Sequence, residues 1–399
     1  MIRSIHPFPA RMAPELALAS LADLPQGSVV LDPMSGSGTV IRQAAEMGHR
    51  PVGFDMDPLA VLMSRVWTRS VKDDLVEKIS TEIFREARIL RLEDATLPWV
   101  DESAVTTAFI KYWFGQEQQE DLRRLAFVLH KFSQRRFSKE KQAAADVVRI
   151  ALSRIIVTKE QGASLARDTS HSRPHKVASS SNYDVFDGLS RSIKQVRKRL
   201  TENPEIGNST INLGDARSLR SLKSASVDAV LTSPPYLNAI DYLRGHRMSL
   251  VWLGYQIENL RTVRSNSIGA ERAPNLPLTM SKFEPIQGAM CSVMDLEKKY
   301  RPMVARYSED LYKMVKELSR VTKPGGLATF VVGNSCLKGT FINNSAGVAA
   351  AARMVGFREV RTYERDLPSQ NRYLPLTENG ALGKRMRTET IITFERAFL

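Results

Sequence analysis

The chain is organised around residues 29–39, which read Val29-Val30-Leu31-Asp32-Pro33-Met34-Ser35-Gly36-Ser37-Gly38-Thr39. The apolar residues 29–32 predict a buried strand, residues 33–39 a glycine-rich turn, and residues 40–47 a helix that ends at Gly48. In such a unit the glycines let the backbone approach a ligand, and the helix N-terminus offers unpaired N–H groups. This order predicts an α/β fold that receives a nucleotide-like cofactor at the carboxyl end of the strand.

The turn departs from both common phosphate-binding patterns. It lacks the lysine of a P-loop, and its Gly36-Ser37-Gly38 does not extend to G-x-G-x-x-G. Asp32 at the strand end would repel a phosphate but attract a cationic amino group. A second predicted strand, 51–55, ends in Asp55, which lies 19 residues beyond Gly36, the spacing at which an acid reaches ribose hydroxyls. A nucleoside with a cationic amino-acid tail and no phosphate fits this site, so we predict S-adenosylmethionine as the cofactor.

A second polar strand end occurs at residues 232–236, which read Thr232-Ser233-Pro234-Pro235-Tyr236. The preceding apolar run, 227–231, predicts a buried strand, and two consecutive prolines cannot continue its ladder. A small hydroxyl, a fixed carbonyl and an aromatic ring are therefore expected at the edge where open α/β sheets bind ligands. Taken alone, the same residues also fit a simple strand stop with a packed tyrosine.

Two further acids belong to predicted strand ends. Asp215 follows a strand at 210–213 and either accepts from an exocyclic amine such as that of adenine or stabilises its own turn. Asp57 precedes a helix at 58–65 and is expected to cap it.

Composition bounds the class of protein. The 399 residues are 43% hydrophobic and 25% charged, which is ordinary for a soluble globular protein. No apolar run is long enough for a membrane span, no signal-peptide pattern is visible, and the two cysteines, Cys291 and Cys336, exclude a disulfide framework and a cysteine-based metal site. A cytoplasmic protein is expected. The net charge of +14 favours a polyanionic partner, with a merely basic enzyme as the alternative.

Residues 67–208 interrupt the α/β pattern. Helical periodicity is present at 75–92, 117–132, 139–157 and 185–200, whereas the polar stretch 164–176 predicts a loop. Between residues 111 and 210 there are 19 Lys and Arg against 11 Asp and Glu, a net charge of +8. Such a surface suits phosphate contacts, and a solvated helical lid is the alternative. The candidate DNA-binding residues are Arg167, Arg173, Lys176, Arg197, Lys198 and Arg199.

The α/β pattern resumes after residue 209. A helix is predicted at 240–253, then a loop or small insertion at 254–303 that contributes to target recognition. A helix at 306–321 and a tight turn at 323–326 follow. The last predicted elements are strands at 327–332, 357–363 and 390–394, with a helix at 346–355.

Together these residues resemble the DNA amino-methyltransferases, which methylate an exocyclic nitrogen of cytosine or adenine. The resemblance lies in His6-Pro7-Phe8-Pro9-Ala10-Arg11, which is similar to the family's cofactor arm, in the glycine loop at 32–39, in Gly53-Phe54-Asp55, and in Ser233-Pro234-Pro235-Tyr236. The loop has Met34 where the family usually has Phe. The resemblance covers residues 1–65 and 209–399 and leaves the inserted segment unexplained.

The resemblance implies an S-adenosylmethionine-dependent methyltransferase fold: a Rossmann-like, seven-stranded, mostly parallel sheet with an antiparallel last strand, here with a large helical insertion. The catalytic domain would comprise 1–66 and 209–399, and the insertion 67–208 would contact DNA. The implied catalytic residues are Ser233, Pro234, Pro235 and Tyr236. The implied cofactor-binding residues are His6, Pro7, Phe8, Asp32, Pro33, Ser35, Gly36, Gly38, Thr39, Asp55 and Asp215.

The expected reaction is direct methyl transfer to a flipped-out base in double-stranded DNA. The Ser233 hydroxyl and the Pro234 carbonyl would accept hydrogen bonds from the amine, and Tyr236 would stack on the base. Methylation at carbon 5 of cytosine needs a nucleophilic cysteine, commonly after a proline, and neither cysteine follows one. Within the resembling family, serine at the first motif position favours cytosine N4, with adenine N6 as the second possibility.

Three alternatives stay open at this point: an adenine-N6 enzyme, an RNA base amino-methyltransferase, and an inactive DNA-binding scaffold. A prokaryotic, nucleoid-associated enzyme with a cognate restriction endonuclease is the expected setting.

Overall fold

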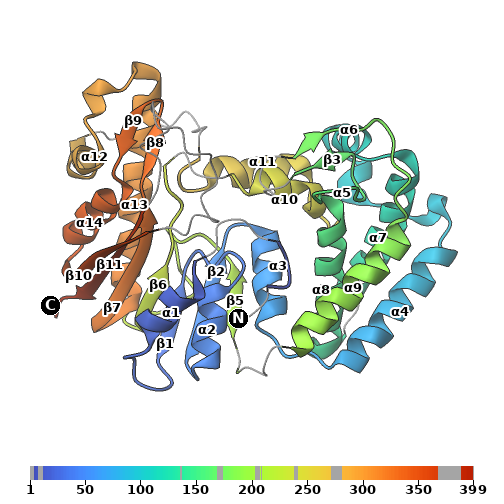
Figure 1. Ribbon diagram of the computed structural model, residues 1–399, viewed down its shortest axis with the longest axis horizontal. Coiled ribbons are helices and arrows are strands. Elements are labelled where there is room, and N and C mark those ends of the chain that lie inside the picture. Colours follow the sequence, from blue (N-terminus) through green and yellow to red (C-terminus); the bar gives the residue numbers. More distant parts are fainter. Residues whose placement is uncertain are drawn as a thin grey trace.

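The computed structural model describes residues 4–7, 12–134, 137–168, 174–202, 207, 209–237, 241–270, 281–366 and 388–398. A central sheet carries the fold, and helices cover both of its faces (Figure 1). Within the described ranges, no helix combines the length and the apolarity that crossing a bilayer requires.

The sheet has seven strands in the order β10-β11-β7-β6-β1-β2-β5. All neighbouring pairs from β7 to β5 are parallel, whereas β11 runs antiparallel to both β7 and β10. The predicted mostly parallel sheet with an antiparallel last strand is confirmed. The strands are β1 Val29–Asp32, β2 Arg50–Asp55, β5 Thr210–Leu213, β6 Val227–Thr232, β7 Thr322–Gly333, β10 Phe357–Asp366 and β11 Thr388–Arg396.

Alternation along the strands divides the core into two layers. On β1, Val30 packs with helices α1 and α2, whereas its neighbour Leu31 packs with α13 and α14. This two-residue period follows from the pleat, because successive side chains point to opposite faces. The covering helices are α1 Pro14–Leu21, α2 Thr39–Glu46, α3 Pro58–Trp67, α13 Arg301–Val321 and α14 Asn344–Met354.

The segment between α3 and β5 forms a helical body with its own core. Its elements are α4 Asp73–Ile89, α5 Pro98–Asp101, α6 Ala104–Trp113, α7 Gln116–Gln134, α8 Lys139–Ile156, α9 Val185–Thr201 and the strand pair β3 Ala166–Arg167 and β4 His175–Lys176. The four long helices match the predicted periodic segments. The core of this body continues into α3 and into two helices that follow the Pro-Pro motif, α10 Leu243–Leu250 and α11 Ile257–Asn266. The insertion is therefore packed against the sheet domain rather than tethered beside it (Figure 1).

Several elements differ from the sequence prediction. Within 254–303, predicted as a loop or small insertion, the structure has the helices α11 and α12 Glu284–Met290, and the predicted helix 240–253 is the shorter α10. The short hairpin β3–β4 lies in the stretch predicted as loop. These elements have only two to ten residues, so each turns too few apolar side chains toward the core to make a visible period.

The predicted tight turn at 323–326 lies inside β7. Val227 of β6 pairs with Thr322, and Ala229 pairs with Leu327, so four residues of β7 bulge opposite Asp228 alone. Gly325 takes a positive φ of 74° at this bulge, and the Lys323 ammonium reaches the Asp228 carboxylate at 2.5 Å. The sequence indicated these turn-forming residues correctly. Strand β7 nevertheless stays continuous, because it pairs with β6 before and after the bulge.

Candidate active site

The carboxyl ends of four parallel strands meet at one edge of the sheet. Strand β1 ends at Asp32, β2 at Asp55 and β6 at Thr232, and β5 leads through Gly214 to Asp215. Because the four strands run in the same direction, all the polar residues singled out at their ends lie along this edge. The fold thus brings together side chains that are up to 200 positions apart in the chain.

Asp32 joins the glycine loop to the Pro-Pro motif. The Thr232 hydroxyl donates to the Asp32 carboxylate at 2.8 Å, and the Met34 N–H donates to the same oxygen at 3.2 Å. Both partners are buried, Asp32 with 3% and Thr232 with 0% of its surface exposed. Burial raises the pKa of Asp32 to about 7, the two hydrogen bonds oppose that rise, and the Asp55 charge adds to it.

The glycine loop comes close to its neighbours through a left-handed backbone. Gly36 has φ 49° and Gly38 has φ 90°, and a Cβ on Gly38 would lie 2.5 Å from the Ser64 hydroxyl oxygen of α3. Gly38 also precedes the first residue of α2, Thr39, so no side chain caps this helix. The helix N-terminus therefore stays open toward the sheet edge, as the sequence predicted for a cofactor loop.

Asp55 holds the loop from the second strand. Its carboxylate accepts from the Gly36 N–H at 2.8 Å and from the Asp57 N–H at 2.9 Å. Burial raises the pKa of Asp55 to about 6, with a further rise from the Asp57 charge. The Asp32 carboxyl is buried and the Asp55 carboxyl is half-buried at neighbouring strand ends, and the His246 charge only partly offsets the raised pKa of Asp55. A ligand with a positive charge and hydroxyl donors would stabilise this arrangement.

Asp57 caps α3 as predicted, since it accepts from the Leu59 N–H at 2.9 Å. Its other oxygen lies 2.5 Å from Nδ1 of His246 on α10. Sequence reasoning missed His246, because the two residues are 189 positions apart and no local pattern connects them. The pair ties α10 to the cofactor side of the sheet.

The residues present fit S-adenosylmethionine. Asp32 and Asp55 offer acceptors for an ammonium group and for ribose hydroxyls, and the Gly36–Gly38 backbone leaves room for close approach. Ser35 adds an independent observation: its hydroxyl is buried in this loop and has no hydrogen-bond partner in the part of the chain that the structure describes. An orphaned polar group of this kind indicates an absent ligand.

The Pro-Pro motif is held from three sides. The Tyr307 hydroxyl of α13 donates to the Pro235 carbonyl at 2.9 Å, and the Leu237 N–H donates to the Asn344 side chain of α14 at 3.2 Å. Asn344 also donates to the carbonyl of Gly333, the last residue of β7, at 3.1 Å. The backbone after β6 is thus fixed by the helices that follow it in the chain.

Within the motif, Tyr236 is half-buried and linked to Ser233. Burial raises the pKa of the Tyr236 phenol to about 12, the Glu389 charge adds to the rise, and hydrogen bonding with the Ser233 hydroxyl and the Gly333 backbone opposes it. The Ser233 hydroxyl and the Tyr236 phenol are therefore neighbours within the motif. Among the described residues, no hydrogen bond is made to the Pro234 carbonyl.

The N-terminal arm is described at residues 4–7, so Phe8 lies outside the described residues. His6 is buried, with Nε2 3.0 Å from the Ser153 hydroxyl of α8 and Nδ1 3.0 Å from the Pro7 carbonyl. Two arginines of the insertion, Arg154 and Arg199, donate to backbone carbonyls of the arm. The predicted cofactor arm is therefore anchored on the helical insertion.

Asp215 already has a strong partner. The Arg217 guanidinium binds its carboxylate at 2.7 Å, and the Arg217 N–H adds a bond of 2.9 Å. The same guanidinium contacts Asp310 of α13 at 2.5 Å and the Asn266 carbonyl of α11 at 2.6 Å. Sequence reasoning missed Arg217, although its place two residues after Asp215 at a strand end was a usable signal.

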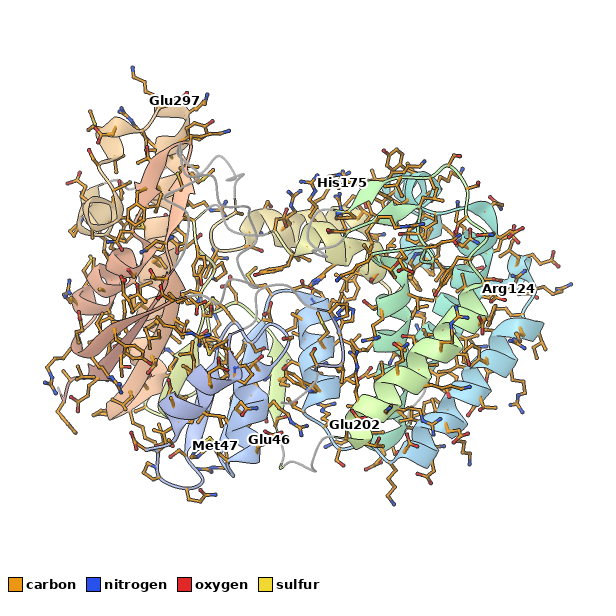
Figure 2. All side chains as sticks on the ribbon, viewed as in Figure 1. Glu46, Met47, Arg124, His175, Glu202 and Glu297 are labelled. Atoms are coloured by element: carbon orange, nitrogen blue, oxygen red, sulfur yellow. The ribbon has the colours of Figure 1, made fainter. Side chains whose placement is uncertain are left out.

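The described members of the predicted DNA-binding set do not form one surface. Arg197 binds Asp73 and Glu77 of α4 at 2.7 and 2.9 Å, and Lys198 lies 3.9 Å from Glu202. Arg167 and Lys176 lie on the β3–β4 hairpin, and Arg173 is outside the described residues. Figure 2 shows His175 of that hairpin at one end of the insertion and Glu202, just after α9, at the other.

The strand order is that of the S-adenosylmethionine-dependent methyltransferase fold, and the residues at this edge of the sheet fit that cofactor. A family model for an RMKL-like methyltransferase domain matches residues 3–87, the part with the glycine loop and Asp55. The chain is 21% identical to the type II methyltransferase M.BsoBI of Geobacillus stearothermophilus, over 85% of this chain and 75% of that protein. It is 22% identical to the type II methyltransferase M.MvaI of Kocuria varians, over 92% and 84%. The resemblance to DNA methyltransferases predicted from the motifs thus extends over most of the chain.

Among solved structures, a SAM-dependent methyltransferase from Methanosarcina mazei aligns with 10% identity over 96% of this chain and 98% of that chain, with a TM-score of 0.34. That score is low, so the fold assignment rests on the strand order and directions of this chain.

Proposed function

We propose that this protein is a site-specific DNA methyltransferase that transfers the methyl group of S-adenosylmethionine to the exocyclic N4 amine of cytosine in duplex DNA. One observation carries the proposal: the Thr232–Asp32 hydrogen bond fixes Ser233-Pro234-Pro235-Tyr236 directly beside the cofactor loop. A base-binding motif and a methyl-donor site then share one edge of the sheet. The type II methyltransferases that align with most of the chain support the same substrate class.

The motif supplies acceptors for the amine. An exocyclic amine is a weak nucleophile, because its lone pair is delocalised into the ring, and positive charge develops on nitrogen during transfer. The Ser233 hydroxyl carries lone pairs that can accept a hydrogen bond from the amine. The Pro234 carbonyl is the second acceptor, and its backbone is held rigid by the Tyr307 bond to Pro235.

Bound S-adenosylmethionine supplies an electrophilic methyl group on a sulfonium. Asp32, Asp55 and the glycine loop hold and orient the donor, while Ser233 and Pro234 align the amine with it. The Tyr236 ring contributes a stacking face for the extruded base, which offsets part of the few kcal/mol that extrusion costs. No strong base is required, because the product proton can leave to water.

Serine at position 233 favours cytosine N4 in the resembling family, and adenine N6 is the second candidate, since a hydroxyl accepts from either amine. A cognate restriction endonuclease is part of the same proposal.

The deciding experiment expresses the gene in a host that lacks DNA methylation and sequences its DNA with a method that separates N4-methylcytosine from N6-methyladenine. We expect N4-methylcytosine in one sequence context, lost in Ser233→Ala and kept in Ser226→Ala, the matched serine at the opposite end of β6. N6-methyladenine would move the assignment to the second candidate. Purified enzyme that labels tRNA or rRNA but no duplex DNA would refute the DNA substrate.

A further inference from the structure

Helices α10 and α11 carry four arginines. Arg244 and Arg247 lie on α10, and Arg261 and Arg264 lie on α11. The Arg247 guanidinium lies 5.2 Å from the centre of the Phe109 ring, and Phe109 lines the same groove as Arg261. Burial lowers the pKa of Arg247, and the charges of Arg264, Arg261 and Arg244 lower it further, while Asp241 opposes them, so Arg247 lies within electrostatic reach of the other three.

The two carboxylates nearby balance the charge of this cluster only in part. Asp241 binds Arg264, and Glu258, which accepts from the Ser103 hydroxyl at 2.7 Å and the Thr106 hydroxyl at 3.2 Å, is also attracted by the Arg261 charge. Within the described ranges, Arg244, Arg247 and Arg261 make no ion pair, and the buried Nε of Arg247 has no hydrogen-bond partner. Arg244 and Arg261 are exposed to solvent. Four arginines against the two carboxylates Asp241 and Glu258 leave a positive surface, which favours an anionic partner.

Aromatic side chains adjoin the arginines. Arg261 and the α6 residues Phe109, Tyr112 and Trp113 line an open groove of about 480 Å³. Tyr112 is 54% exposed, and the Lys176 ammonium lies 4.6 Å from the centre of its ring. The groove therefore joins the arginine cluster to the β3–β4 hairpin, so cations alternate with aromatic faces along one surface.

Each of the two helices α10 and α11 is also hydrogen-bonded to residues near the active site. His246 of α10 binds Asp57 beside the cofactor loop. At the end of α11, Asn266 accepts from Arg217, and Ser265 accepts from Arg306 of α13 at 2.6 Å. In Figure 1 the two helices lie between the sheet and α6. A partner bound here is held at a fixed distance from Ser233.

We propose that the surface formed by α10, α11, the exposed face of α6 and the β3–β4 hairpin binds the sugar–phosphate backbone of duplex DNA beside the target base. This inference rests on the proposed function and gives it a location. Phosphate contacts position a duplex and dominate its salt-dependent affinity, and exposed arginines such as Arg244 and Arg261 are suited to them. The α9 residues predicted from charge alone fit less well, because Arg197 is already bound by two carboxylates.

The first test compares the double variant Arg244→Ala/Arg261→Ala with Lys78→Ala/Lys194→Ala, which removes two exposed cations from α4 and α9. The dissociation constant for an unmethylated duplex is measured against salt concentration. We expect the slope of log K against log salt to shrink by about 1.8 for the arginine variant, about 0.9 for each lost phosphate contact, and to stay unchanged for the lysine variant. Unchanged S-adenosylmethionine binding by both variants shows that they are folded.

The second test uses tryptophan fluorescence. Trp113 is the one indole of the four in the chain that is not buried, since Trp67, Trp99 and Trp252 are each at most 8% exposed. DNA binding in the groove should change the emission of the wild type and of Trp67→Phe but not of Trp113→Phe.

A wild-type salt slope in the arginine variant, or a DNA-induced change that persists in Trp113→Phe, would overturn the proposed surface while leaving the proposed function intact. A wild-type protein that binds no duplex at low salt, or prefers structured RNA to duplex DNA, would instead overturn the proposed function and the surface with it.

Discussion

Replacing Asp55 with asparagine tests the cofactor site most directly. Each Asp55 oxygen accepts one backbone N–H, from Gly36 and from Asp57, and each keeps lone pairs for a ligand. The substitution keeps the size of the side chain but puts an NH₂ in place of one oxygen. That NH₂ faces a backbone N–H and can no longer accept from a ribose hydroxyl.

The magnitude follows from the lost bond. A hydrogen bond to a charged acceptor contributes about 1.5–3 kcal/mol, so the affinity for S-adenosylmethionine should fall about 10- to 150-fold. The pH dependence is a second signature. Because the bond needs the ionised carboxylate and burial raises the pKa of Asp55 to about 6, wild-type affinity should fall as the pH drops from 8 through 6. In Asp55→Asn the fall in cofactor affinity near pH 6 should be absent. A fall in affinity near pH 7, where Asp32 becomes protonated, should remain.

The assay is titration calorimetry with S-adenosylmethionine from pH 5.5 to 8.5, with Asp228→Asn as the matched control. Asp228 also accepts a backbone N–H, that of Val29 at 2.8 Å, but it lies at the amino end of β6, on the opposite edge of the sheet. The control should bind the cofactor like the wild type. Equal affinities for Asp55→Asn and Asp228→Asn, or an unchanged pH profile in Asp55→Asn, would refute the role assigned to Asp55.

Three further predictions concern the same edge. A carboxyl group with a raised pKa stabilises the fold below its unfolded pKa and loses that contribution as the pH rises through its folded pKa, which is about 7 for Asp32. Asp32→Asn should therefore raise the unfolding free energy of the cofactor-free protein at pH 8 by on the order of 2–4 kcal/mol and change it little at pH 4. Equal gains in unfolding free energy at both pH values would contradict this expectation. Gly38→Ala should destabilise the fold by more than the roughly 1 kcal/mol expected for Gly27→Ala, because a Cβ at Gly38 meets the Ser64 hydroxyl oxygen at 2.5 Å and one at Gly27 meets nothing within 4 Å. Denaturant unfolding measures the stability of both variants. Similar losses of stability in the two would show that loop packing does not matter. Tyr236→Ala should lower the rate of methyl transfer about 10- to 100-fold and leave the cofactor affinity nearly intact. Tyr236→Phe should recover most of the transfer rate, because its ring still stacks on the base. Lost cofactor affinity with a normal transfer rate in Tyr236→Ala would count against stacking.

Much of the sheet could be predicted because its signals are local. The strands at 29–32 and 210–213 have the predicted bounds, and Asp57 caps the helix that follows it, as expected from residue type and position. The long helices of the insertion were visible from their apolar period. Short elements such as α6 and α11, and the bulge within β7, were not, because pairing and packing with distant segments decide them.

The candidate site shows the same division. Sequence motifs identified Asp32, Asp55 and Ser233, since each follows a strand and carries a recognisable neighbour pattern. The contacts that position them, Thr232 to Asp32 and Asp57 to His246, join residues about 200 positions apart and leave no local trace. Charge counting located a basic region but not its partners, so it could not show that Arg197 is bound by acids of α4.

The sequence by itself determined the order of the sheet strands and of the long helices, the glycine loop, the strand-end acids and the proline stop after β6. These depend on backbone preferences and apolar periods that act within a few residues. Only the tertiary structure decided that the Pro-Pro motif lies against the cofactor loop, that Asp215 is bound by Arg217, and that α10 and α11 gather more arginines than carboxylates. Burial and charge pairing depend on which distant segments meet in space, and that is settled when the sheet and the helical insertion pack together.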